Sequence, residues 1–202
     1  MRKLTLFCTV VLLLAQRRAS APAELTQILG RPADRSITLS VLSPTAIENA
    51  VVEYGPKPGN YTAKSKPLRV PANQATEIEL SGLQPNTRYY YRLSGTSEER
   101  SFHTQRARGA TFTFGVQGDS HPERFNRMYH PDLYNRTMDN VRRDRPDFYI
   151  LLGDDFSVDT INQANPRAVT QPQVVERYTI QRPYLGIIGR SIPVFLVNGN
   201  HE

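Results

Sequence analysis

Residues 192–202 read Ile-Pro-Val-Phe-Leu-Val-Asn-Gly-Asn-His-Glu. A continuous apolar run of this kind predicts a strand that is buried on both faces of a sheet, and the polar residues after it then lie at the carboxyl edge of that sheet. In open α/β sheets, ligands bind at the carboxyl edge. The stretch therefore predicts an α/β sheet with a polar site at Asn200 and His201.

Two earlier stretches repeat this pattern. The apolar run that begins at Phe112 ends in Gly118-Asp119-Ser120-His121, and the run over residues 148–152 ends in Gly153-Asp154-Asp155. Each polar cluster begins with a glycine, which lets the backbone turn sharply at the end of the strand. The sequence thus predicts three strand ends that carry carboxylates, imidazoles and an amide.

Segments with helical spacing lie between the three predicted strands. Tyr134, Met138 and Val141 are spaced as on one helix over residues 131–143, and Val174, Val175 and Tyr178 indicate a second helix that cannot run past Pro183. Residues 156–173, which are rich in Asn, Gln and Pro, are expected to form a long loop. The alternation of strand and helix predicts a parallel sheet with crossover helices.

The residue types at the strand ends suit a metal site. Asp119 and His121 are separated by one residue, so both can face one cation. Asp154 can bridge two ions through its two oxygens, and Asn200 offers a neutral carbonyl oxygen. A mixed oxygen and nitrogen set without sulfur suits Mn, Fe, Zn or Co. Each residue alone is commonplace in loops, but their joint occurrence at three successive strand ends favours a metal site.

Residues 25–104 follow a different pattern, with a period of two. Apolar residues alternate with polar ones around Ile37, Leu39 and Val41, and turn residues such as Pro58-Gly59-Asn60 separate the runs. Short alternating strands with regular turns predict an antiparallel β-sandwich. Residues 105–109 then indicate a short linker.

One phrase in this region is more specific. Leu83-Gln84-Pro85-Asn86-Thr87-Arg88-Tyr89-Tyr90-Tyr91-Arg92-Leu93 resembles the signature of fibronectin type III domains. Tyr89 would be the corner tyrosine whose hydroxyl bonds back to the backbone. The alternative is that the three tyrosines form an aromatic platform for a ligand, but their period-two spacing favours a core strand. His103 is expected to be a surface strand residue.

The three polar motifs, taken together, resemble the first three motifs of the calcineurin-like metallophosphoesterases, and a sandwich ahead of them resembles the layout of purple acid phosphatases. The resemblance implies a fibronectin type III-like β-sandwich followed by the N-terminal half of an α/β metallophosphoesterase fold. It also implies an acid phosphatase-like phosphomonoesterase with two metal ions (Fe, Zn or Mn) and a phosphorylated small-molecule substrate. Asp119 and His121 would bind the first ion, Asp154 would bridge, and Asn200 would bind the second. His201 would be the catalytic proton donor to the leaving group.

The chain departs from the family pattern in two respects. Purple acid phosphatases have a tyrosine ligand where this chain has Ser157, and they lack the histidine that stands here at His121. The iron(III) preference of that branch is therefore not expected. The family also needs further histidines after the third motif, whereas only His103 and His130 remain. We expect a chain truncated after the third motif that is inactive alone, and Asp155, at a variable position, is assigned no metal.

Two other functions compete with this prediction. One is a non-catalytic secreted binding protein that keeps a remnant of the enzyme domain. Intact motifs argue against it, because a decayed site has no chemical reason to retain Asp119, His121, Asp154, Asn200 and His201 together. The other is a phosphodiesterase or nucleotidase of the same superfamily, which residues that hold metal ions cannot distinguish.

The charge distribution and the N-terminal residues indicate where the protein is located and which partners are not expected. The net charge is +6, but Arg2, Lys3, Arg17 and Arg18 lie in the first 21 residues, which leaves +2 for the rest and gives no reason to expect nucleic acid. Basic residues followed by a short apolar run predict a signal peptide at residues 1–23. The apolar run is too short to span a membrane, which takes about 20 apolar residues. The mature protein is then secreted or periplasmic, without a membrane span, and loses its one cysteine, Cys8. The predicted domains are the sandwich at 24–106 and the metallophosphoesterase part at 110–202.

Overall fold

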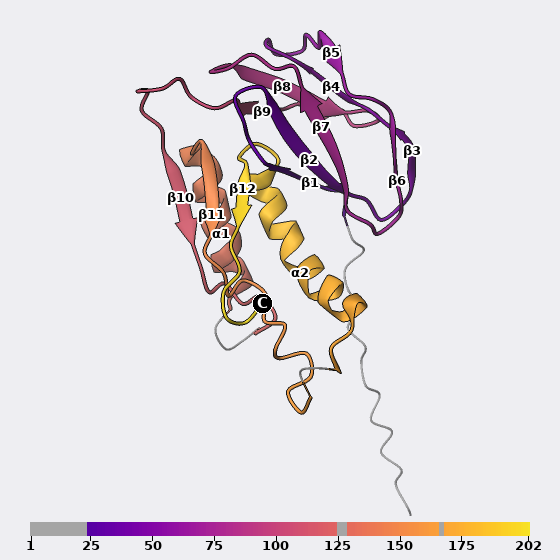
Figure 1. The fold of residues 1–202 in the computed structure, drawn as a ribbon, viewed down its shortest axis with the longest axis vertical. Coiled ribbons are helices and arrows are strands. Elements are labelled where there is room, and N and C mark those ends of the chain that lie inside the picture. Colours follow the sequence, from indigo (N-terminus) through magenta and orange to yellow (C-terminus); the bar gives the residue numbers. More distant parts are fainter. Residues whose placement is uncertain (1–23, 125–128, 166–167) are drawn as a thin grey trace, which may run out of the picture.

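The computed structural model describes residues 24–124, 129–165 and 168–202. The predicted signal peptide lies outside the described residues. Figure 1 shows a β-sandwich followed by a three-stranded sheet with two helices, and α2 runs between the sandwich and that sheet. None of the described helices combines the length and the apolar character that a membrane crossing requires.

The sandwich consists of antiparallel strands, as the period-two pattern predicts. One sheet has the order β1-β2-β7, another has the order β5-β4-β8-β9, and β3 pairs with β6. The strands are β1 (Thr26–Gly30), β2 (Ser36–Leu42), β3 (Ile47–Ala50), β4 (Val52–Gly55), β5 (Ala63–Lys64), β6 (Leu68–Val70), β7 (Thr76–Ser81), β8 (Arg88–Leu93) and β9 (Arg100–His103).

The core of the sandwich contains the residues that the alternation points inward. Ile37, Leu39 and Val41 are buried, and so are Tyr89 and Tyr91. The Tyr89 hydroxyl accepts the backbone N–H of Gln84 at 2.9 Å, which confirms the predicted tyrosine corner. Because Tyr89 and Tyr91 are core residues, the alternative of an aromatic ligand platform is wrong.

The second part of the chain forms a parallel sheet of order β10-β11-β12 with two crossover helices, as predicted. The elements are β10 (Phe114–Gln117), α1 (Pro131–Asp144), β11 (Phe148–Leu151), α2 (Gln171–Gly189) and β12 (Val194–Leu196). At the start of α2, the Gln173 side chain accepts the backbone N–H of Thr170 at 2.9 Å in a capping box, which explains where the helix begins.

The prediction that the strands are buried on both faces is wrong. The strand order advances in one direction, and crossovers of the same hand then place both helices on one face of the sheet. Tyr149 and Leu151 face α1 and α2 and are buried, whereas Phe114, Val116 and Phe195 are 55%, 51% and 40% exposed. Side chains on the other face therefore form an open apolar surface.

The prediction that the second helix cannot run past Pro183 is also wrong, because α2 continues to Gly189. Proline removes one backbone donor, but α2 gains packing on two sides beyond it. Leu185 and Ile188 join the core of the parallel sheet, and a Cβ on Gly189 would lie 2.9 Å from Ile28 in β1. This tertiary burial keeps the helix intact past the proline.

Polar contacts also join the two parts of the chain. The Arg182 guanidinium of α2 donates to Thr26 Oγ1 at 2.7 Å and to the Ser40 carbonyl at 2.9 Å. The Tyr91 hydroxyl of the sandwich donates to the Arg190 carbonyl at 2.8 Å, just after α2. The structure therefore holds the carboxyl edge of the parallel sheet away from the sandwich, as the strand arrows in Figure 1 show.

Candidate metal centre

The polar segments after β10, β11 and β12 meet at one edge of the sheet. The backbone N–H of Asp119 donates to the Gly153 carbonyl at 3.1 Å, and that of Val197 donates to the Leu151 carbonyl at 2.9 Å. The parallel register therefore continues into the loops, which brings together residues that lie more than 30 positions apart in the chain.

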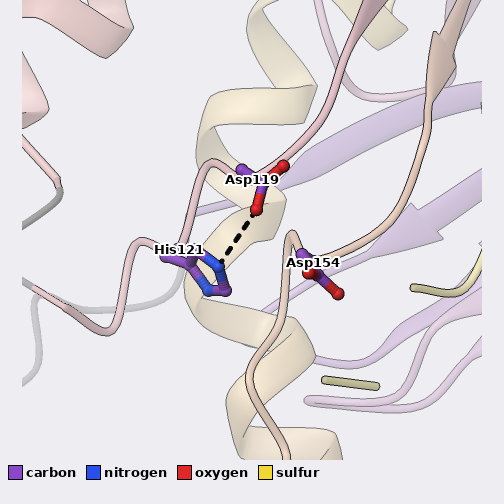
Figure 2. Close-up of side chains that lie close together, drawn as sticks. All are labelled: Asp119, His121 and Asp154. Carbon is purple, nitrogen blue, oxygen red and sulfur yellow. Dashed lines mark ion pairs between the residues drawn. The ribbon is translucent and has the colours of Figure 1, made fainter. Parts of the chain in front are cut away.

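Asp119, His121 and Asp154 form a group that could hold a metal ion. One ligand atom from each of the three side chains lies within 4.8 Å of the others, and Figure 2 shows the Asp119 carboxylate facing the His121 ring. Atoms bound to one ion at about 2.0–2.2 Å are at most ~4.4 Å apart, so only small side-chain movements are needed. The oxygen and nitrogen donors fit the kind of ion that the sequence predicts.

Hydrogen bonds orient the imidazole of His121, which is 1% exposed. Its Nδ1 lies 2.7 Å from Ser157 Oγ and 3.2 Å from Glu123 Oε1, and a carboxylate can only accept. We therefore assign the ring proton to Nδ1. The lone pair on Nε2 then faces Asp119 Oδ1, 3.7 Å away, which is the arrangement of a histidine ligand whose other nitrogen donates to protein groups.

The backbone of these three residues is unusual. Asp119, His121 and Asp154 have φ values of 58°, 39° and 56°, in the left-handed region that few residues other than glycine adopt. Such conformations cost about 1–3 kcal/mol each and cluster at functional sites. The same three residues form the candidate metal group, and their backbone conformation independently supports a functional role for this edge of the sheet.

Two glycines explain how closely the loops approach one another. A Cβ on Gly153, which has φ of 99°, would collide with the backbone of Gly199, and a Cβ on Gly199 would collide with the Asp154 side chain. A sharp turn of the backbone is therefore only part of the reason why these positions need glycine. The second and third motifs need glycine because their backbones touch.

Glu202 ties the second motif to the third, a role that the sequence does not predict. Its carboxylate accepts four backbone N–H groups, those of Asp154 at 3.0 Å, Asp155 at 2.8 Å, Phe156 at 3.1 Å and Gly199 at 2.6 Å. Hydrogen bonds to a carboxylate are roughly twice as strong as neutral ones. Only the place of Glu202 directly after Asn200 and His201 could have drawn attention to it.

His201 also lies at this edge. Its backbone N–H donates to Asp154 Oδ1 at 3.1 Å, and its ring centre lies 5.5 Å from that of His121. Its Nδ1 lies 2.7 Å from Asp159 Oδ2, so the carboxylate orients the ring. Asn200, between Gly199 and His201, is exposed. The sequence does not single out Asp159, which lies in the predicted long loop.

Asp155 faces a different environment from Asp154. It is 1% exposed, and its Oδ1 accepts from the Ser120 hydroxyl at 2.7 Å and from Gln117 Nε2 at 3.4 Å. Burial raises the pKa of the Asp155 carboxyl, and the hydrogen bonds from Ser120 and Gln117 oppose that rise. These contacts connect the first strand end to the second.

The two remaining histidines lie in different places. His130 precedes α1 and lines, together with Asp119, a cavity of about 260 Å³ beside the candidate metal group. His103 lies at the end of β9 in the sandwich, with Nδ1 2.6 Å from the Thr104 carbonyl. It is partly buried, so the prediction of a surface strand residue holds only in part.

Comparisons with known proteins agree with this organisation. Residues 22–104 match the family described as Purple acid Phosphatase, N-terminal domain. Purple acid phosphatase 21 of Arabidopsis thaliana is 27% identical over 160 residues, which cover 76% of this chain and 32% of that protein. Purple acid phosphatase 22 of the same plant is 27% identical over 162 residues, with the same shares covered. The chain thus spans about a third of the length of these relatives.

A solved structure extends the likeness to both parts of the fold. The structure of PhoD superposes with a TM-score of 0.58 at 17% sequence identity, over 91% of this chain and 40% of that one. At this identity the match concerns the fold alone. The family match and the plant relatives show that the chain is similar to purple acid phosphatases, and that its sandwich corresponds to their N-terminal domain.

Proposed function

We propose that this protein is a metal-dependent phosphoester hydrolase of the acid phosphatase type. The observation that carries the proposal is the gathering of Asp119, His121 and Asp154 within 4.8 Å at the carboxyl edge of a parallel sheet. The relation to purple acid phosphatases supports the same reaction class.

The three side chains would have different tasks. His121, held through Nδ1, would offer Nε2 to an ion, and Asp119, with a side chain that is 71% exposed, would complete the same ligand set from the solvent side. Asp154 would use its free lone pairs toward that ion and a second one, while Oδ1 keeps the His201 backbone N–H. Asn200, exposed in the adjoining loop, would serve the second ion.

His201 would hold a proton for the leaving group. The Nδ1–H of His201 would donate a hydrogen bond to Asp159, which leaves Nε2 as the nitrogen available to a substrate. When bound, metal ions of this kind supply Lewis acidity toward a phosphoryl oxygen. The substrate would be a small phosphomonoester outside the cytoplasm, in keeping with the predicted signal peptide.

A titration of metal-free protein with Mn²⁺ and Zn²⁺ tests the proposal. We expect binding that Asp154→Asn weakens by more than about 100-fold, because even partners outside the ligand shell are worth about 10–100-fold. Asp144→Asn, an exposed carboxylate at the end of α1, is the matched control and should bind as wild type does. A wild-type chain that binds neither ion would contradict the proposal.

Hydrolysis of a substrate is tested separately from metal binding. The described residues bring together one group of three carboxylate and imidazole ligands, so we expect the 202-residue chain to bind metal without hydrolysing p-nitrophenyl phosphate. Metal-dependent release of p-nitrophenol that disappears in Asp154→Asn would overturn that expectation while leaving the reaction class intact.

A further inference from the structure

A second charged feature lies at the opposite edge of the parallel sheet. A cavity of about 590 Å³ lies between the sandwich strands β8 and β9 and the residues that precede β11 and β12. The candidate metal group follows those strands, so the two features are separated by at least the four residues of β11, or about 13 Å. The cavity is therefore distinct from the strand-end site.

Arginines dominate the lining of this cavity. Two come from the sandwich strands, one from the segment after β9, two from the end of α1 and one from the segment after α2. They are Arg88, Arg100, Arg106, Arg142, Arg145 and Arg190. The sequence alone explains Arg142 and Arg145 as cations that suit a helix end, but the fold places them beside four arginines from other elements.

Carboxylates balance only part of this charge. Glu98 pairs with Arg100 and with Arg190, Asp147 pairs with Arg106, and Asp139 pairs with Arg142. Glu99 also lines the cavity, but its Oε2 accepts from the Gly59 backbone and the Tyr61 hydroxyl. Six guanidinium groups are thus accompanied by four carboxylates, and the part of the chain that is described forms no ion pair with Arg88 or Arg145.

Arg100 is the most enclosed of these arginines. Its side chain is 14% exposed, and its Nε has no hydrogen-bond partner among the described residues. Burial, together with the like charge of Arg190, lowers the pKa of Arg100 to about 10, so the group stays charged at neutral pH. A buried donor and crowded like charges both cost free energy that a bound anion would relieve.

We propose that this cavity is a binding site for a small anion that carries several phosphate groups. Guanidinium forks bind phosphate oxygens in pairs, and several forks from different directions suit an anion with more than one phosphate. The volume falls within the range of small-molecule sites, about 300–1,000 Å³. Because the lining comes from both the sandwich and the parallel sheet, such an anion would also join the two parts of the chain.

Calorimetric titration of the metal-free 202-residue chain with tripolyphosphate tests this site. The double variant Arg142→Gln/Arg145→Asn removes two exposed cavity arginines, and Asn tolerates the left-handed backbone of Arg145, with φ of 51°. We expect it to weaken binding at least about 10-fold, since hydrogen bonds to charged groups are stronger than those between neutral groups. Arg136→Gln/Arg143→Gln, on the same helix but outside the cavity, is matched in charge and should leave the affinity unchanged.

Other outcomes would overturn the inference. Equal losses in the two double variants would mean attraction to net charge alone, and no binding by the wild type would mean that the cavity is no site. A multivalent sulfate compound of equal charge that binds as tightly would remove the preference for phosphate. Asp154→Asn should leave the affinity for tripolyphosphate unchanged, and a loss there would assign the anion to the strand-end site instead.

Discussion

The hydroxyl of Ser157 lies 2.7 Å from Nδ1 of His121. Ser157 and His121 stand where the resemblance to purple acid phosphatases leads us to expect a tyrosine ligand and no histidine. We propose that the two departures are one coupled change. In this proposal the serine orients an imidazole that would supply a nitrogen ligand in place of the tyrosine.

Ser157→Ala should weaken metal binding by about 10–100-fold, because it removes a partner that fixes the ring of His121. Ser157 is fully buried, so some loss of stability is expected as well. Ser94→Ala removes a hydroxyl that accepts the Val51 N–H at 3.0 Å in the sandwich and serves as the control, with wild-type metal affinity. Equal metal affinity for Ser157→Ala and wild type, measured by calorimetry, would refute the coupling.

Glu202→Gln should loosen the contact between the second and third motifs. The amide places an N–H₂ where backbone donors point, so at least one charge-assisted bond is lost, at about 1.5–3 kcal/mol. For a chain of this size the melting temperature should fall by roughly 3–12 °C. Glu176→Gln, exposed on α2, should melt as wild type does in differential scanning fluorimetry. An unchanged melting temperature for Glu202→Gln would show that the four hydrogen bonds are dispensable.

Gly153→Ala should be far more harmful than Gly109→Ala. Both glycines have positive φ, which costs an alanine about 1–2 kcal/mol. Only Gly153 would also press its Cβ into neighbouring backbone, that of Gly199, which adds a further cost of about 1–3 kcal/mol. Urea unfolding of the two variants measures the difference. Similar midpoints would contradict the close approach of the two loops.

The open face of the parallel sheet should bind apolar dyes. Val116 and Phe195 share this face, because each is in register with Ile150 of the central strand. Val116→Thr/Phe195→Thr should lower the fluorescence of a bound naphthalene sulfonate dye and raise solubility, because it breaks up an exposed apolar patch. Leu68→Thr, at a 40% exposed leucine of the sandwich, should change neither quantity. Dye fluorescence that stays at the wild-type level in the double variant would mean that the dye binds elsewhere.

Local patterns were enough to predict much of this fold. Alternation around Ile37, Leu39 and Val41 predicts the sandwich core, and the spacing of Tyr134 and Met138 predicts the buried side of α1. At Pro183 the local sequence leads to a wrong prediction for the end of a helix. The cost of a proline inside a helix can be read from the sequence, but the packing of Leu185 and Gly189 against two different sheets that offsets it cannot.

Some residues of the candidate site can likewise be predicted from the sequence, and others cannot. Asp119, His121 and Asp154 are predicted because carboxyl ends of parallel strands must meet. Glu202 and Ser157 are missed, since their roles depend on contacts between loops about 36–48 positions apart. The arginine cavity is missed for the same reason, because its charge builds up only when β8, β9 and the end of α1 come together.

The most direct test of the metal site is a titration of the metal-free chain with Co²⁺, followed by visible absorption. We expect absorption bands of Co²⁺ bound to nitrogen and oxygen ligands, which should vanish or change in His121→Ala and persist in His103→Ala. Identical spectra for His121→Ala and wild type, or no bands for wild type at all, would contradict a metal centre at Asp119, His121 and Asp154.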